Sequence, residues 1–226
     1  MKLPIALITG AGTGLGKELA RLLSKTHHVV LVGRRDAELM ELAEEINLSG
    51  SATPLTCDIS QQDQVTSLEK QLLNLSLLPV DIVVNNAGVG HFGSLETNNI
   101  EEWNQMFQTN VYGPMLITKT FLPYMKESKG KFINILSTAA LRGKVNESGY
   151  VASKFAFRGF SESIAKEVEP HGIRVIRAYM GGMNTPFWES SSHVENAAAF
   201  RTPSEVAEII ISRMDSEDEI VIESRK

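Results

Sequence analysis

Tyr150 and Lys154 are the pair of residues whose types and spacing are best suited to chemistry, because they lie four positions apart in a stretch of helical composition. Residues at this spacing share one face of a helix. A free phenol has a pKa of about 10, so tyrosine is neutral and weakly basic at neutral pH. A nearby ammonium favours the phenolate and allows the phenol to donate or accept a proton. The pair predicts acid–base chemistry, although a surface lysine near a tyrosine is also common.

Two polar segments follow apolar runs that read as strands. Ser137 follows the run 132–136, and Asn85-Asn86-Ala87-Gly88 follows the run 81–84. In a parallel sheet, the carboxyl ends of the strands border one ligand crevice. We therefore expect the Ser137 hydroxyl to hold a substrate carbonyl there. The alternative is that Ser137 and Thr138 are turn residues at the end of the strand.

A glycine-rich segment, Thr9-Gly10-Ala11-Gly12-Thr13-Gly14-Leu15-Gly16, joins the first expected strand to the first expected helix. Gly10 allows a tight turn, and Gly14 lets the backbone approach a pyrophosphate that meets the free N–H groups of the helix start. Gly16 lets that helix lie close to the sheet. The TGxxxGxG spacing indicates dinucleotide binding, with a purely structural turn as the alternative.

The residues after the second strand indicate which dinucleotide is bound. An acidic residue there accepts hydrogen bonds from the adenosine ribose, but this chain has Gly33-Arg34-Arg35. Arg34 can hold a 2′-phosphate by charge-assisted hydrogen bonds, which favours NADP(H) over NAD(H). The alternative is that both arginines are solvated loop charges. Asp58 ends the third strand, where we expect it to accept a bond from the adenine amine, to cap the next helix, or both.

These residues need a scaffold, and the pattern along the chain predicts one. Near-continuous Val/Ile/Leu runs alternate with helical stretches, as in strands that helices cover on both faces. Repeated strand–helix units imply right-handed crossovers and a parallel sheet. We predict an α/β, Rossmann-like, doubly wound and mostly parallel sheet with helices on both faces, in a single domain over residues 1–226. The expected strands are 5–9, 29–32, 53–57, 81–84, 132–136, 175–179 and 219–222, and the expected helices include 15–25, 37–48 after an Asp36 N-cap, 101–120, 150–169 and 203–214.

The bulk composition narrows the function classes. A length of 226 residues suits one domain with a sizeable core, and the net charge of −5 gives no support to a nucleic-acid partner. Cys57 is the only cysteine, which excludes an intramolecular disulfide and fits a reducing compartment. We see no signal peptide and no apolar stretch near the roughly 18–20 residues of a membrane span. The expected location is the cytoplasm, with no membrane partner.

In this order and spacing, the motifs resemble a single-domain short-chain dehydrogenase/reductase from about residue 5 to residue 223. The residues that carry the resemblance are Thr9, Gly10, Gly14, Gly16, Asp58, Asn85-Asn86-Ala87-Gly88, Asn110, Ser137, Tyr150 and Lys154. The resemblance implies that Tyr150 is the general acid in reduction and the base in oxidation. It implies that Lys154 lowers the pKa of Tyr150 and binds the nicotinamide ribose, while Ser137 polarises the carbonyl.

The resemblance also implies direct hydride transfer without a metal, and a water held by Asn110 in a proton relay; Asn110 can equally pin a helix. The chain departs from the family at Met180-Gly181, where a proline is usual, so this loop is expected to be more flexible. Thr185 is retained and is expected to bond the nicotinamide amide. The full set of expected cofactor contacts is Gly10, Gly12, Thr13, Gly14, Leu15, Gly16, Arg34, Arg35, Asp58, Ile59, Asn86, Ala87, Gly88, Tyr150, Lys154, Gly181 and Thr185.

The segment after Thr185 and the tail after the last strand are short for the family. We expect an open substrate pocket and, by family analogy alone, a homodimer through the helices that hold Asn110 and Tyr150. The expected pocket residues are His91, Phe92, Leu141, Val145, Phe187 and Trp188. For Phe187 and Trp188, ordinary packing is an equal alternative.

Three functions compete. The first is NADPH-dependent reduction of small ketones, diketones or aldehydes, or the reverse oxidation of an alcohol. The second is reduction of a 3-oxoacyl thioester on an acyl-carrier protein, which needs a basic docking patch such as Arg142 and Lys144. The third is an NADP(H)-binding regulatory protein without turnover, for which the altered Met180-Gly181 loop is the only support.

Overall fold

Seven parallel strands form one sheet in the computed structural model, which describes residues 2–188 and 193–225. The strand order is β3-β2-β1-β4-β5-β6-β7, so the order reverses beside β1, between β1 and β4. Ligands of doubly wound sheets bind at such a switch point, outside the carboxyl ends of the strands. The strands are β1 (Ile5–Thr9), β2 (His28–Gly33), β3 (Ser51–Thr56), β4 (Ile82–Asn85), β5 (Lys131–Ser137), β6 (Arg174–Met180) and β7 (Glu219–Ile222).

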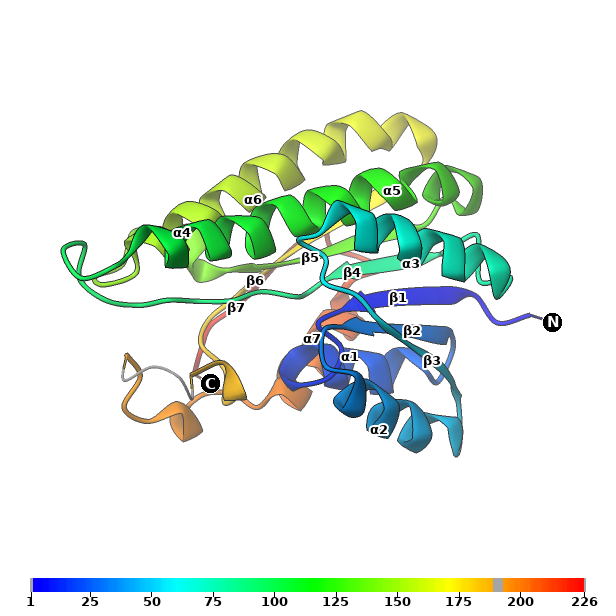
Figure 1. Ribbon diagram of the computed structural model, residues 1–226, viewed down its shortest axis with the longest axis horizontal. Coiled ribbons are helices and arrows are strands. Elements are labelled where there is room, and N and C mark those ends of the chain that lie inside the picture. Colours follow the sequence, from blue (N-terminus) through cyan, green and yellow to red (C-terminus); the bar gives the residue numbers. More distant parts are fainter. Residues whose placement is uncertain (1, 189–192, 226) are drawn as a thin grey trace.

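Helices cover both faces of this sheet (Figure 1). One face carries α3 (Gln62–Asn74), α4 (Ile100–Phe107), α5 (Gly113–Ser128) and α6 (Ser148–Val168). The other face carries α1 (Gly14–Leu23), α2 (Asp36–Asn47) and α7 (Pro203–Arg213). The predicted Rossmann-like architecture is thus confirmed.

The strands alternate their side chains between two separate cores. In β1, Ala6 and Ile8 pack in the core beneath α1, α2 and α7, whereas Ile5 and Leu7 pack in the core beneath α3 and α5. Successive side chains of a strand point to opposite faces, so a strand covered on both sides must be apolar at every position. This requirement explains the continuous apolar runs of the sequence.

Two local expectations were wrong. The tract 101–120 is not one helix, because a π-helical turn at Gln108–Tyr112 separates α4 from α5. Asp36 is not an N-cap: α2 begins at Asp36 itself, and its carboxylate accepts a hydrogen bond from Thr56 Oγ1 at 2.8 Å. A capping box is present at the start of α7, where the Thr202 hydroxyl accepts from the Glu205 N–H and the Glu205 carboxylate accepts from the Thr202 N–H.

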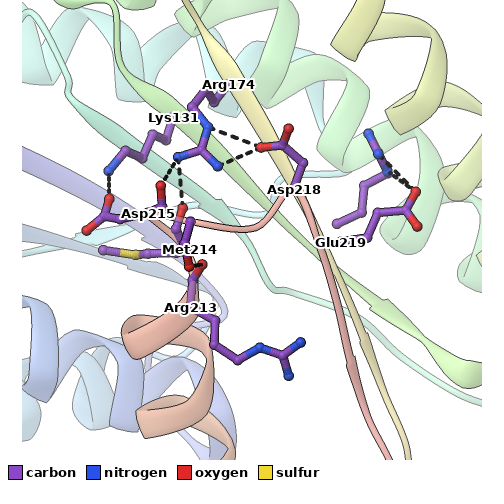
Figure 2. Close-up of polar contacts among 9 residues, drawn as sticks. Lys131, Arg174, Arg213, Met214, Asp215, Asp218 and Glu219 are labelled. Carbon is purple, nitrogen blue, oxygen red and sulfur yellow. Dashed lines mark hydrogen bonds and ion pairs between the residues drawn. The ribbon is translucent and has the colours of Figure 1, made fainter.

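Ion pairs hold the α7–β7 connection against the amino ends of β5 and β6 (Figure 2). Arg174 Nη2 donates to Asp218 Oδ1 at 2.7 Å, and Arg174 Nη1 donates to the Asp215 carbonyl at 2.8 Å. Lys131, at the start of β5, pairs with the Asp215 carboxylate. These groups lie at the opposite end of the strands from Ser137, so the carboxyl ends remain available for a site. Among residues 2–188 and 193–225, the structure has no helix that is both long and apolar enough to cross a membrane.

Candidate active site

A cavity of about 590 Å³ opens at the carboxyl ends of the strands, on both sides of the switch point. Its walls come from the loops after β1, β2, β3, β4, β5 and β6 and from α6. Every expected cofactor residue lines it except Gly16. Of the four expected catalytic residues, Ser137, Tyr150 and Lys154 line it and Asn110 does not.

The glycine-rich loop leaves the start of α1 open toward this cavity. Gly10 and Gly14 have φ angles of +64° and +55°, which side chains rarely tolerate. A Cβ on Gly16 would lie 2.2 Å from the carbonyl oxygen of Gly10, so only glycine lets α1 approach the end of β1. Within the described chain, Thr13 makes no side-chain capping bond to α1, and the first turn holds no acid. The first N–H groups of α1 are therefore suited to an anion such as a pyrophosphate.

Thr9 and Asn86 clamp the tip of β1 to the tip of β4. The Thr9 hydroxyl accepts hydrogen bonds from the backbone N–H groups of Asn86 and Ala87 at 3.0 and 3.1 Å. The Asn86 amide nitrogen donates to the carbonyls of Thr9 and Gly10 at 2.9 and 3.1 Å. This clamp fixes the glycine turn and the Asn86–Gly88 loop relative to each other at the switch point.

The two arginines after β2 differ in what they contact. Arg35 pairs with Glu38 at 3.0 Å and reaches Thr13 Oγ1 at 3.4 Å. Arg34 is exposed, lines the cavity, and forms no hydrogen bond or ion pair with the described residues. An arginine held at a cavity wall without an acidic partner is suited to a phosphate.

Asp58 lines the cavity, but it does not cap α3. Its Oδ1 accepts bonds from the N–H and the hydroxyl of Ser60, at 3.0 and 2.7 Å, in a turn that precedes Gln62. Next to it, burial raises the pKa of the Cys57 thiol to about 11, which keeps this thiol protonated and inert. The open helix start and the glycine turn together fit the pyrophosphate of a nicotinamide dinucleotide.

Ser137, Tyr150 and Lys154 converge at the other end of the cavity. Ser137 ends β5, and its hydroxyl accepts a bond from the Ala139 N–H at 3.1 Å. Tyr150 and Lys154 lie on the inner face of α6, with exposed fractions of 9% and 6%. The Lys154 ammonium lies 5.7 Å from the centroid of the Tyr150 ring and donates to the Ile135 carbonyl at 3.3 Å.

Burial dominates the electrostatics of this group. Burial raises the pKa of the Tyr150 phenol above its usual value, hydrogen bonding with Ser137 lowers it, and the charge of Glu147 raises it further. Burial also lowers the pKa of the Lys154 ammonium to about 8. The expectation that Lys154 lowers the pKa of Tyr150 stays a prediction, because burial, Ser137 and Glu147 are the influences resolved on this phenol. The phenol is therefore protonated at neutral pH, the form that can donate a proton.

Asn110 lies outside the cavity and connects two of the segments that form its walls. It lies in the π-helical turn, and its side chain is 1% exposed. The amide oxygen accepts from the Val89 N–H at 2.9 Å, while the amide nitrogen donates to the Val89 carbonyl and to Ser153 Oγ at 2.9 and 3.0 Å. The side chain thus pins the loop after β4 to α6, and a relay water on Asn110 stays a prediction.

The expected substrate pocket is only partly assembled. His91, Phe187 and Trp188 line the cavity, and Phe92 lies behind them with its ring centroid 5.4 Å from that of Tyr150. Leu141 and Val145 do not line the cavity that the described residues form. They are 37% and 85% exposed, because the β5–α6 loop turns them outward to solvent.

The loop that departs from the family is anchored to the last strand. The Gly181 N–H donates to the Ile222 carbonyl at 2.8 Å, and the Gly182 N–H donates to Ser224 Oγ at 2.8 Å. Thr185 reaches across to Gly14, close enough that a Cβ there would lie 3.3 Å from Thr185 Cγ2. Met180 therefore ends a strand whose next residues are held by hydrogen bonds. The flexibility expected of this loop stays a prediction.

Several residues that line the cavity were not among the expected site residues, and they include Gln105, Glu147 and Met183. Glu147 is the most unusual of them, because this carboxylate is 6% exposed and precedes Tyr150 by one helical turn. Its one sequence signal was an acid at that spacing before Tyr150, which is also an ordinary pattern at helix starts.

The chain matches the family model described as short chain dehydrogenase over residues 4–196. It belongs to the short-chain dehydrogenase/reductase family of oxidoreductases. It is 36% identical over 195 residues to the uncharacterized oxidoreductase YusZ of Bacillus subtilis, covering 84% of this chain and 69% of that protein. It is 35% identical over 192 residues to the 3-ketodihydrosphingosine reductase of Bacteroides thetaiotaomicron, covering 84% and 68%.

A solved structure with a very similar fold is an alcohol dehydrogenase from Thermococcus sibiricus in complex with 5-hydroxy-NADP. The TM-score is 0.90 at 27% identity, over 99% of this chain and 97% of the other. A metagenomic short-chain oxidoreductase in complex with NADP has a TM-score of 0.83 at 28% identity, over 99% and 97%.

Proposed function

We propose that this protein is an NADP(H)-dependent oxidoreductase that reduces the carbonyl group of a small molecule to an alcohol, or runs the reverse oxidation. The observation that carries the proposal is the meeting of Ser137, Tyr150 and Lys154 in the same cavity as the open start of α1. A protonated phenol, a hydroxyl donor and a buried cation at one wall are the groups that carbonyl reduction requires.

Each side chain has a distinct task. When bound, the nicotinamide dinucleotide supplies the hydride that adds to the carbonyl carbon. The Ser137 hydroxyl donates a hydrogen bond to the carbonyl oxygen and orients it. Tyr150 gives its phenolic proton to the same oxygen, which completes the alcohol, and the proton is recovered from solvent. Lys154 holds the nicotinamide ribose and stabilises negative charge on the phenolic oxygen.

The choice of NADP(H) rests on Arg34. A guanidinium at the end of β2 that contacts no carboxylate among the described residues attracts a 2′-phosphate, and no acidic side chain stands at that strand tip to repel it. Two structurally similar proteins contain NADP or a derivative of it, which supports the same choice.

A small free carbonyl substrate is favoured over a carrier-bound one. The chain is 27% identical to the 3-oxoacyl-acyl-carrier-protein reductase FabG of Thermotoga maritima, over 96% of this chain and 92% of that protein. However, Arg142 pairs with Glu223 at 3.5 Å and Lys144 pairs with Glu147 at 3.7 Å. Both cations of the suggested docking patch therefore have acidic partners.

The test is NADPH oxidation with a panel of ketones and aldehydes, comparing the wild type with Tyr150→Phe. Loss of the proton donor should reduce kcat by about 10²–10⁴-fold while NADPH still binds. Equal rates for the two proteins would eliminate Tyr150 as the acid. Bound NADPH without turnover of any carbonyl would instead favour the regulatory alternative.

A further inference from the structure

Aromatic rings wall the substrate end of the cavity. Tyr150, Phe187 and Trp188 line it, and we call these three residues the aromatic wall. Phe187 lies 6.0 Å from Tyr150 and 5.1 Å from Trp188 between ring centroids. Phe92 backs all three, at 5.4, 6.0 and 5.3 Å from Tyr150, Phe187 and Trp188. A substrate carbonyl at the Tyr150 hydroxyl would therefore carry its substituent past several aromatic rings.

Glu147 holds this arrangement in place through His193. The imidazole of His193 stacks on Phe92, with centroids 4.8 Å apart and the rings inclined by 12°. Its Nε2 lies 3.0 Å from Glu147 Oε1. Glu147 Oε2 lies 3.7 Å from the Lys144 ammonium, so the buried carboxylate has two charged or polar partners that offset its desolvation. The Trp188 indole N–H donates to the Met183 carbonyl at 2.9 Å, which fixes the outer ring of the wall.

We propose that Glu147 is a positioning residue that fixes the aromatic wall through His193, and that the wall selects carbonyl compounds carrying an aromatic ring near the carbonyl. This inference rests on the proposed function. A substrate ring packed edge-on or offset against Phe187 and Trp188 gains attraction beyond its buried area. One or two such ring pairs change a binding constant by about 3- to 10-fold.

The position of Glu147 also separates its effect from that of the reacting groups. Glu147 contacts His193 and Lys144, and His193 stacks on Phe92, so the carboxylate acts on the ring positions and not on the carbonyl. Its removal should therefore raise KM for a ketone that carries an aromatic ring, while kcat stays close to the wild-type value. A general disruption of the site would lower kcat for every ketone instead.

The experiment compares two ketones whose carbonyl reactivity is matched, phenylacetone and cyclohexylacetone, with NADPH as reductant. The wild type should show a kcat/KM about 10-fold higher for phenylacetone, mainly through KM. Glu147→Gln and His193→Ala should bring the two values within about 3-fold. In both variants the change should appear mainly in KM for phenylacetone, with kcat for cyclohexylacetone close to the wild-type value. Glu195→Gln is the matched control, because this exposed acid follows His193 by two residues and should change neither the ratio nor KM.

The outcomes separate this inference from the proposed function. Equal kcat/KM for both ketones in the wild type, or an unchanged ratio in Glu147→Gln and His193→Ala, would overturn it and leave carbonyl reduction intact. Absence of NADPH oxidation with every carbonyl tested would overturn both. Titration with NADPH, followed by its fluorescence, confirms that each variant still binds the dinucleotide. If Glu147→Gln fails to fold, the ketone ratio of His193→Ala decides, because His193 is the more exposed partner.

Discussion

Replacing Lys154 by methionine should make the protein more stable and inactive. Lys154 is an ammonium almost enclosed by protein, and burial lowers its pKa from 10.5 to about 8. At about 1.36 kcal/mol per pKa unit, this shift means that the buried charge destabilises the folded protein by about 3 kcal/mol at neutral pH. Methionine has a similar length and carries no charge, so Lys154→Met should recover much of that free energy.

The pH dependence of this gain identifies its cause. The folded-state pKa of Lys154 is below the unfolded one, so the unfolded chain binds more protons between about pH 8 and pH 10.5. Wild-type stability therefore gains from this group as pH rises through that window, and the variant lacks the effect. The advantage of Lys154→Met should be largest at pH 7 and should shrink toward pH 10. The raised pKa of Tyr150 acts in the opposite direction above pH 10, but it is present in both proteins.

The assay is urea unfolding of the cofactor-free proteins at pH 7 and pH 9.5, followed by the fluorescence of Trp103 and Trp188. Lys166→Met is the matched control, because Lys166 is an exposed lysine on the same helix and should give a small, pH-independent difference. A Lys154→Met variant that is less stable than the wild type at pH 7, or whose difference is the same at both pH values, would refute the reasoning.

Three further perturbations test other parts of the structure. Arg34→Asp should weaken NADPH binding by about 10-fold or more and improve NADH binding, measured by fluorescence titration, because the 2′-phosphate loses a charge-assisted partner; an unchanged preference would remove Arg34 as the determinant. Gly16→Ala should cost about 1–3 kcal/mol in urea unfolding, since its Cβ would lie 2.2 Å from the Gly10 carbonyl, and wild-type stability would show that α1 can shift freely. Phe155→Glu should dissociate the proposed homodimer in light scattering, because Phe155 on α6 is a large apolar side chain that is 42% exposed; an unchanged mass would place the interface elsewhere.

The parts of the fold that follow from local pattern were predictable. The inner strands are buried on both faces, and runs such as Ile5–Thr9, whose five residues are all buried, show this requirement directly. The edge strands β3 and β7 are only partly buried. The cofactor end was predictable for the same reason, because glycine identities report backbone constraints directly. Gly10, Gly14 and Gly16 stand where a positive φ or a close approach of two elements excludes a side chain.

The substrate end was not predictable to the same degree, because its walls depend on how loops cross. Leu141 and Val145 were expected to line the pocket, yet the β5–α6 loop turns them to solvent and brings Lys144 and Glu147 to the cavity instead. No local sequence pattern predicts that the Glu147 carboxylate contacts the imidazole of a histidine located 46 residues later. The break at Gln108–Tyr112 was equally hidden, since a π-helical turn uses the same residue types as the helix around it.

The π-helical turn at Gln108–Tyr112 explains how the chain keeps the Lys154 ammonium buried although its desolvation is unfavourable. The π-helical turn directs the Asn110 amide to Ser153, which lies between Tyr150 and Lys154 on α6 and donates in turn to the Tyr150 carbonyl at 2.8 Å. The same amide holds both backbone groups of Val89, the residue after the Asn86–Gly88 loop. A buried lysine would otherwise be relieved by a small shift of α6 that admits water. Because Asn110 joins α6 to the loop after β4, such a shift would break its hydrogen bond to Ser153, and Lys154 stays buried where its charge can act.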